Sequence, residues 1–288
     1  MGITMMGSEV AKAMKENLIQ EVEVLKGKGI TPHLTIIRVG DRPDDVTYER
    51  NAKRRMELVG IACNVIELEE TVSQEEFENV FCQVNQDENV HGILLFQPLP
   101  DHLDVEKVKS RIHPYKDVDC MCIENAAKVF MGDQTGHAPC TAEAVMEMLR
   151  HYEIPVAGKR VVVLGRSLVI GRPLSMLMLE QNATVTICHS KTENLEEVCK
   201  EADILVAAVG RPRMVTGQMV REEAVVVDVG INVDEKGNLC GDVDFEDVEA
   251  RASYISPVPR GVGSVTTSVL AGHVIQAAKL LCDEAIKG

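Results

Sequence analysis

Two glycines and the residues between them give the second half of the sequence a candidate phosphate-binding loop. The segment VVVLGRSLVIGRP (161–173) places Gly165 and Gly171 between a β-branched strand pattern and a helix pattern. Gly165 would allow a tight turn, and Gly171 would let backbone N–H groups and the helix N-terminus approach a phosphate. Ser167 occupies the middle position, so the loop is a shortened form of the GxGxxG fingerprint. A dinucleotide site is one interpretation, and a βα loop that needs glycine for steric reasons alone is the other.

The next strand pattern indicates which dinucleotide such a loop would take. ATVTICHSKT (183–192) ends in Ser190 and Lys191 and carries no acidic residue there. NAD-binding folds use an Asp or Glu at this place for the ribose hydroxyls, whereas a 2′-phosphate needs cations and hydroxyls. Arg166, Ser190 and Lys191 therefore favour NADP over NAD. For each cation taken singly, a solvated loop residue is the alternative.

Alternating strands and helices must position these residues. Short β-branched runs predict strands at residues 33–40, 63–69, 91–97, 159–165, 183–190, 202–210 and 224–230. Apolar residues at helical spacing predict helices at residues 7–28, 44–60, 73–86, 172–181 and 264–286. Near-continuous Val, Ile and Leu in alternating strands and helices indicates an α/β fold, with parallel sheets covered on both faces.

The alternation of strand and helix patterns is interrupted over residues 98–158, which indicates a domain boundary near 140–150. We expect an N-terminal α/β substrate domain with a parallel sheet over 1–140, and a Rossmann-like NAD(P)-binding domain over 141–266. The helix at 267–288 has no following strand and is expected to pack back on the first domain.

Composition excludes several classes of function. The 288 residues carry a formal net charge of −15, which disfavours nucleic acid and anionic lipid, and aromatics make up only 3%. No apolar run approaches the roughly 20 residues of a membrane span, and the N-terminus lacks a signal-peptide pattern. The nine cysteines are scattered through apolar runs, so we expect reduced thiols and a cytoplasmic protein.

Ten collinear segments resemble the methylenetetrahydrofolate dehydrogenase/cyclohydrolase family over nearly the whole chain. They are VGDRPDDVTY (39–48), GILLFQPLP (92–100), PYKDVD (114–119), PCT (139–141), GRSLVIGRP (165–173), TVTICHSKT (184–192), DILVAAVGRP (203–212), VVVDVGIN (225–232), GDV (241–243) and PVPRGVGSVT (257–266). The resemblance implies two α/β domains with the active site in the cleft between them, and usually a homodimer. It also implies oxidation of 5,10-methylenetetrahydrofolate with NAD(P) and hydrolysis of the methenyl product to 10-formyltetrahydrofolate.

The resemblance also assigns site residues. The active-site residues are Tyr48, Gln97 and Asp119. The cofactor-binding residues are Gly165, Arg166, Ser167, Gly171, Ser190, Lys191 and Ile231. The residues that would contact the tetrahydrofolate substrate, which can carry a polyglutamate tail, are Tyr48, Asp119, Pro259, Gly261 and Gly263. Structural alternatives remain for the first group: a half-buried helix tyrosine, a glutamine that satisfies backbone before Pro98, and a loop carboxylate paired with Lys116.

The folate side departs from the family pattern. The family has Tyr-x-x-x-Lys, but four residues after Tyr48 stands Ala52. Lys53 is one residue further, and a step of about 100° aims it off the Tyr48 face. Further departures are Asp45 for a Ser, Cys120 and Cys122 within the family's Asp-Gly-x-His, and Arg260, Ser264 and Val265 within Pro-Val-Pro-Gly-Gly-Val-Gly-Pro-Met-Thr. Arg260 stands in a glycine position, where it would either pair with a substrate carboxylate or block the site.

The two family reactions differ in what they demand of position 52. Hydride transfer is driven by the neighbouring nitrogen lone pair and needs placement, whereas hydrolysis needs a base to take a proton from water. A lysine of lowered pKa suits that task, and alanine cannot titrate. We therefore predict NADP-dependent dehydrogenase activity with weakened cyclohydrolase activity.

Three other functions remain open. The chain could bind folate and NADP without turnover, or it could be a dehydrogenase with a shifted substrate. Cys120, Cys122, His137 and Cys140 offer four soft metal ligands within 21 residues, but the first spacing is short for zinc and we expect no metal.

Overall fold

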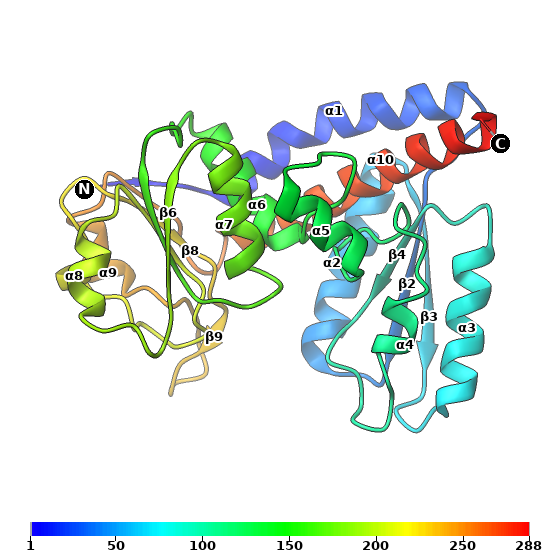
Figure 1. The fold of residues 1–288 in the computed structure, drawn as a ribbon, viewed down its shortest axis with the longest axis horizontal. Helices are drawn as coiled ribbons and strands as arrows, with labels where there is room; N and C mark the ends of the chain where they lie inside the picture. Colours follow the sequence, from blue (N-terminus) through cyan, green and yellow to red (C-terminus); the bar gives the residue numbers. More distant parts are fainter. Residues whose placement is uncertain (1, 288) are drawn as a thin grey trace. The chain divides into compact units, whose positions relative to one another are not determined.

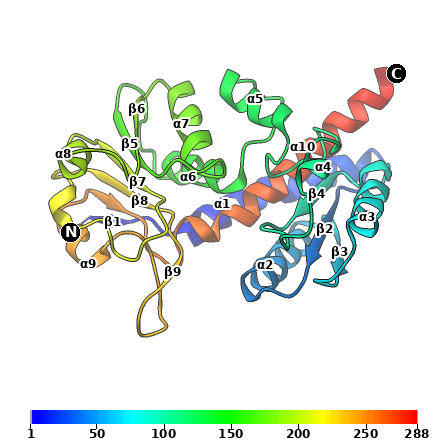
Figure 2. The ribbon, with the colours of Figure 1, turned by 60° about the horizontal axis from the view of Figure 1, so that its bottom comes forward.

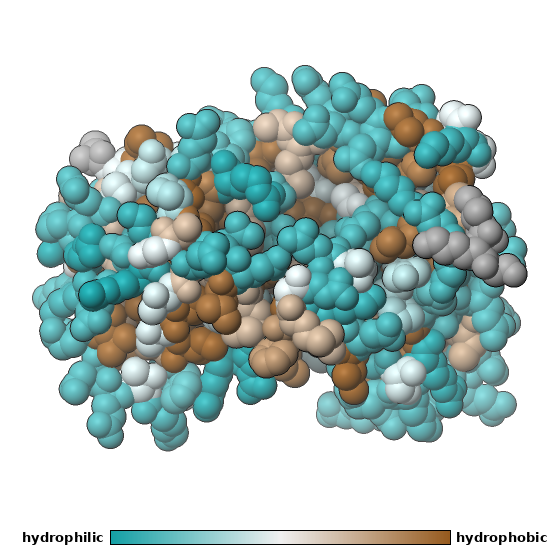
Figure 3. Space-filling view, turned by 45° about the horizontal axis from the view of Figure 1, so that its top comes forward, coloured by the Kyte–Doolittle hydropathy of each residue, from teal (hydrophilic) through white to brown (hydrophobic). Residues whose placement is uncertain are grey.

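A computed structural model describes residues 2–287, with side chains described as far as Glu284. The chain forms two compact units. One holds the residues up to Lys12 together with Thr141–Thr266, and the other holds Ala13–Cys140 together with the residues from Thr267 onward. Within the described residues, no helix is both long and apolar enough to cross a membrane. The face shown in Figure 3 is mostly hydrophilic, and apolar side chains gather in smaller patches.

A three-stranded parallel sheet in the order β3-β2-β4 forms the centre of the unit around Ala13–Cys140 (Figure 1). Its strands are β2 (His33–Val39), β3 (Ala62–Leu68) and β4 (Gly92–Leu95). The helices assigned to this stretch of chain are α2 (Pro43–Val59), α3 (Gln74–Gln86), α4 (Glu106–Lys109) and α5 (Ile123–Met131). Phe77 and Phe81 of α3 pack with Ile37 of β2 and Ile93 of β4 in one buried core. This sheet therefore has the layered packing that its apolar strands predict.

Local sequence explains where α2 begins and ends. Pro43 opens the helix with two acidic residues in its first turn, which suits the positive helix N-terminus. Gly60 ends it at φ 84°, in the left-handed conformation that glycine adopts without strain. This helix carries Tyr48 and Ala52 between those two stops.

A six-stranded sheet in the order β1-β11-β8-β7-β5-β6 forms the other unit, and every strand pair in it is parallel. Its strands are β1 (Ile3–Thr4), β5 (Arg160–Leu164), β6 (Thr184–Cys188), β7 (Ile204–Ala207), β8 (Val225–Asp228) and β11 (Tyr254–Ile255). A hairpin of β9 (Asn232–Val233) and β10 (Leu239–Cys240) stands apart from it. The helical elements are α7 (Gly171–Glu180), α8 (Leu195–Lys200), α9 (Phe245–Glu249) and the 3₁₀ turns η1 (Gly217–Met219) and η2 (Val262–Ser264).

Three longer helices cross the boundary between the two units in sequence. They are α1 (Gly7–Gly27), α6 (Cys140–His151) and α10 (Thr266–Lys287), all visible in Figure 2. The strands and helices predicted from sequence are confirmed within a few residues at their ends. The two-residue strands β1, β9, β10 and β11 were not predicted.

Candidate functional site

The carboxyl ends of four parallel strands lie level with one another in the six-stranded sheet. Leu164 of β5 pairs with Cys188 of β6 and with Ala207 of β7, which in turn pairs with Asp228 of β8. The chain passes from β5 to β6 on one side and to β7 on the other, so the strand order switches here. Ligands of open α/β sheets bind outside the carboxyl ends of strands at such a switch. The loops after these strands carry the predicted cofactor residues.

Backbone contacts require both glycines of the loop after β5. Gly165 has φ 118°, and a Cβ there would overlap the carbonyl oxygen of Ala208, after β7. A Cβ on Gly171 would overlap the carbonyl oxygen of Gly165. The Ser167 hydroxyl accepts a hydrogen bond from Ile170 N–H at 3.1 Å, so this side chain shapes the loop itself. The two glycines thus let backbone segments approach one another closely, and α7 begins at the second of them.

Two cations and a hydroxyl lie exposed on that loop and on the turn after β6, and β6 itself ends without an acidic residue. Arg166 is exposed, and Arg172 fixes its backbone by donating from Nε to its carbonyl at 3.1 Å. After β6, Lys191 N–H donates to His189 Nδ1 at 3.1 Å, which forms a turn with Ser190 and Lys191 exposed. The arrangement suits a phosphate, because each of these side chains can donate hydrogen bonds to it.

Ile231 links the predicted cofactor residues to the predicted folate residues of this unit. Its side chain is 70% exposed although its neighbours in sequence are held by buried groups. A Cβ on Gly263 would lie 3.8 Å from Ile231 Cδ1, in ordinary contact. The loop of Pro259, Arg260 and Gly261 precedes Gly263, and a Cβ on Gly261 would overlap the Pro257 carbonyl. Arg260 has φ 81°, a conformation that glycine would adopt more easily.

In the other unit, Tyr48 lies against Phe96, the residue that precedes Gln97 at the end of β4. The Tyr48 ring packs edge-on against Phe96 with centroids 5.9 Å apart, and Tyr48 is half-buried. Gln97 follows Phe96 directly and is exposed. A side chain from α2 and one from the loop after β4 are therefore brought together although about fifty residues separate them.

Asp119 reaches the same strand end along a neighbouring segment. Asp117 forms a parallel bridge with Ile93 of β4, which brings Asp119 level with the end of that strand. Asp119 Oδ1 accepts the Cys140 N–H at 2.8 Å, and burial raises the pKa of its carboxyl to about 6. Lys116 instead donates from Nζ to the carbonyls of Asn85 and Asp87, at 2.8 Å each. An Asp119–Lys116 ion pair is not found.

The side chain at position 52 is inaccessible to solvent. Ala52 is fully buried in α2 and Lys53 is exposed, as the one-residue step along the helix predicts. Arg55, which the sequence analysis did not single out, is half-buried seven residues after Tyr48 on the same side of the helix, and burial lowers the pKa of its guanidinium. Helical spacing from Tyr48 is the signal that would have found it.

The cysteines of the folate side have structural positions. Cys120 has φ 57°, and burial raises the pKa of its thiol. Cys122 Sγ accepts the Asn125 N–H at 3.4 Å and caps the N-terminus of α5. Cys140 Sγ lies 3.6 Å from His273 Nδ1. Across residues 2–287, no group of three or more His, Cys, Asp or Glu side chains is placed to hold a metal ion.

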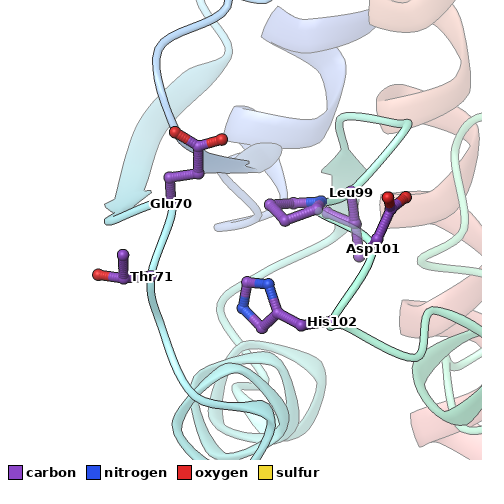
Figure 4. Close-up of a pocket in the computed structure, with 6 residues that line it drawn as sticks. Glu70, Thr71, Leu99, Asp101 and His102 are labelled. Atoms are coloured by element: carbon purple, nitrogen blue, oxygen red, sulfur yellow. The ribbon is translucent and has the colours of Figure 1, made fainter.

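A hollow of about 580 Å³ lies beside the turn that follows Gln97. Glu70 and Thr71 line one side of it, and Leu99, Asp101 and His102 line the other (Figure 4). A second hollow of about 370 Å³ adjoins Gly40 and Pro98. The predicted site residues do not line either one, so neither hollow is the predicted site itself.

Comparisons with known proteins find the same family in both halves of the chain. The family model for the tetrahydrofolate dehydrogenase/cyclohydrolase catalytic domain matches residues 5–119, and the model for the NAD(P)-binding domain of that family matches residues 139–282. The bifunctional protein FolD of Clostridioides difficile (strain 630) is 56% identical over 274 residues, covering 95% of this chain and 96% of that protein.

Two solved structures are similar over nearly their whole length. The bifunctional FolD enzyme of Campylobacter jejuni has a TM-score of 0.94 and 38% identity, covering 97% of this chain and 99% of that one. The Trypanosoma brucei enzyme, solved with NADP cofactor and an inhibitor, has a TM-score of 0.92 and 36% identity, covering 100% and 99%. With both family models matched in order, the chain belongs to the tetrahydrofolate dehydrogenase/cyclohydrolase family.

Proposed function

We propose that this protein oxidises 5,10-methylenetetrahydrofolate to 5,10-methenyltetrahydrofolate with NADP, and that its cyclohydrolase activity is weak. Family membership supports the reaction, and the NADP named for the Trypanosoma brucei relative supports the cofactor. The observation that carries the cofactor choice is the exposed group of Arg166, Ser190 and Lys191 without a carboxylate at the end of β6.

Different residues would bind different phosphate groups of NADP. Arg166, Ser190 and Lys191 would hold the 2′-phosphate, while the loop from Gly165 to Gly171 receives the diphosphate at the start of α7. The nicotinamide, when bound, accepts the hydride that leaves the methylene carbon. These residues fix the dinucleotide across the strand ends, and Ile231 offers it an apolar contact at β8.

On the folate side, Asp119 would accept hydrogen bonds from N–H groups of the pterin. Tyr48 and Gln97 flank the same strand end and would orient the ring system. The hydrogen leaves the methylene carbon as a hydride, together with both electrons of the carbon–hydrogen bond. None of these groups therefore has to remove a proton during oxidation. The geometry therefore supports a hydride transfer that depends on how the two reactants are positioned.

Hydrolysis of the methenyl product is a different demand. A water must lose a proton as it attacks, and the buried Ala52 carries no group that can take it. The guanidinium of Arg55 stays protonated in proteins and is no substitute base. We expect methenyltetrahydrofolate to accumulate.

A coupled assay tests this proposal by following NADPH and methenyl absorbance together from methylenetetrahydrofolate and NADP. Both signals should rise in step. Binding of both ligands without NADPH formation would instead show a non-catalytic binding protein, and turnover of other substrates alone would show a shifted specificity. Either result overturns the proposal.

The variant Ala52→Lys tests the assignment of the missing base. Its amine should increase the rate of methenyl hydrolysis by on the order of 10²–10⁴, while Lys53→Ala in the original chain changes nothing. Fast hydrolysis by the unchanged protein would contradict the assignment. Because Ala52 is fully buried, circular dichroism of the variant must first show that it folds.

We further propose a cytoplasmic homodimer. The dimer rests on the family resemblance, and the compartment on the nine free thiols, which suit a reducing environment. Sedimentation equilibrium would test the dimer.

A further inference from the structure

Two buried carboxylates, Asp228 and Asp242, lie beneath the loops at the carboxyl ends of β7 and β8. Asp228 is 3% exposed and Asp242 is fully buried. Buried carboxylates are costly unless hydrogen bonds satisfy them. Neither residue belongs to the predicted site, although Asp242 lies in the GDV segment that contributes to the family resemblance. We call them the aspartate pair.

Asp242 binds one loop and one neighbour of Ile231. Its carboxylate accepts four hydrogen bonds: three from the backbone N–H groups of Val209 (2.6 Å), Gly210 (3.0 Å) and Arg211 (2.8 Å), and one from Asn232 Nδ2 (2.9 Å). The first three form the loop after β7, and Asn232 directly follows Ile231. One side chain therefore ties the β7 loop to the β8 loop.

Asp228 binds the other neighbour of Ile231 and the segment that carries Asp242. Its carboxylate accepts three backbone N–H groups, those of Gly230 (3.0 Å), Asp242 (3.0 Å) and Val243 (2.9 Å). The hairpin of β9 and β10 returns the chain from Ile231 to this point. Both residues that flank Ile231 are thus fixed from below.

Two glycines allow the pair to pack so closely against backbone. A Cβ on Gly230 would overlap the Asp242 carboxylate, and a Cβ on Gly241 would overlap the Asp228 carboxylate. This arrangement is reciprocal, since each aspartate packs against the glycine that belongs to the loop of the other. The backbone has little room to move on either side.

The loop after β8, which these hydrogen bonds fix, carries an exposed apolar side chain, that of Ile231. Ile231 is 70% exposed, between two neighbours that are hydrogen-bonded to buried groups. An exposed isoleucine gains nothing for folding from being held so firmly, whereas a ligand that packs on it would benefit from its fixed position. The residues proposed for the 2′-phosphate lie at β5 and β6, so a dinucleotide across the strand ends presents its nicotinamide half at β7 and β8.

We infer that Asp228 and Asp242 are positioning residues that hold Ile231 and the loop after β7 against the nicotinamide half of the dinucleotide. This inference rests on the proposed NADP binding and adds to it a residue pair that acts through Ile231. The pair contributes to affinity for the whole dinucleotide and not to affinity for its adenosine bisphosphate portion.

Calorimetric titration with NADP and with adenosine 2′,5′-bisphosphate tests the inference. Asp242→Asn places an amide N–H₂ against N–H donors, so it should weaken NADP binding by on the order of tenfold and leave the bisphosphate affinity unchanged. Asp247→Asn, at an exposed aspartate, is the control. Asp247 also accepts a backbone N–H, that of Gly217 at 2.6 Å, but none from the two loops, and its change should alter neither affinity.

A double-mutant cycle separates positioning from a general structural role. Ile231→Ala should weaken NADP binding in the original protein and have little further effect in Asp242→Asn, because both changes remove one contact. Additive losses, or equal loss of NADP and bisphosphate binding, would overturn the inference. If the original protein binds neither ligand, the proposed function itself fails. Should Asp242→Asn not fold, Asn232→Ala removes only the hydrogen bond from Asn232 Nδ2 to Asp242. It should likewise weaken NADP binding and leave the bisphosphate affinity unchanged.

Discussion

At the residue scale, packing sets both the position and the pKa of Asp119, the residue proposed to bind the pterin. Its position at the end of β4 follows from the bridge between Asp117 and Ile93, a contact that the sequence alone does not reveal. The family resemblance predicts a site role for this residue, whereas its raised pKa could not be predicted, because desolvation depends on the packed structure.

The raised pKa of Asp119 predicts how folate affinity depends on pH. Below about pH 6 the carboxyl is protonated in the folded protein and cannot accept two N–H groups, so KM for the folate should rise as the pH falls through that value. The same group favours folding fully below the pKa of an unfolded aspartate, and that contribution is lost as the pH rises through about 6. Steady-state kinetics across this range would measure the first effect.

Asp119→Asn should remove the pH dependence of KM near 6, at the cost of weaker binding throughout. Asp133→Asn is a suitable control, since Asp133 is exposed and the Thr135 N–H lowers its pKa. A KM that is flat with pH in the unchanged protein would contradict the role given to Asp119.

Cys120 predicts a second, purely structural effect. Its φ of 57° costs a residue other than glycine about 1–2 kcal/mol of conformational free energy. Glycine avoids this strain, but it loses more conformational entropy on folding, which offsets part of the gain. Cys120→Gly should therefore raise the free energy of unfolding by roughly 0.5–1 kcal/mol, measured by urea denaturation. Cys82→Gly, inside α3, should lower it by a similar amount.

At the element scale, runs of apolar residues fix most of the fold. β5, β7 and β8 could be predicted because nearly continuous Val, Ile and Leu leave few alternatives. β1, β11 and the hairpin of β9 and β10 could not, because a strand of two residues has no periodicity. The hairpin is what brings Asp242 beneath the loops, so the same omission concealed the aspartate pair.

The loop before α7 gives a prediction at this scale. A methyl group on Gly171 would displace the backbone at Gly165, so Gly171→Ala should lower the free energy of unfolding by about 1–3 kcal/mol and weaken NADP binding. Thermal unfolding and titration would measure the two losses. Gly27→Ala, at the end of α1 with open space around its Cβ position, should cause neither. Unchanged NADP affinity in Gly171→Ala would contradict the proposed phosphate loop.

At the scale of the whole molecule, charge makes the cofactor site depend on a few residues. With a net charge of −15, the chain as a whole repels a phosphate-rich ligand, so the local cations must supply the attraction. The net charge and the candidate cations both follow from the sequence, because neither needs knowledge of packing.

Arg166→Ala should therefore reduce the ratio of kcat/KM for NADP to kcat/KM for NAD by about tenfold. The loss should be smaller at high salt, where exposed charges are screened. Lys236→Ala is a control on the exposed loop between β9 and β10. Loss of activity with both cofactors to the same degree would mean that Arg166 does not recognise the 2′-phosphate.

The pairing of β1 with β11 has a consequence for how the chain is made. Ile3 lies beside Tyr254, so β1 has no partner on the ribosome until β11, far along the chain, has also been synthesised. This pairing joins segments far apart in sequence, which makes it slow to form relative to local contacts. A change that restrains the residues of β1 would therefore slow this pairing and leave the other strands of the sheet free to form.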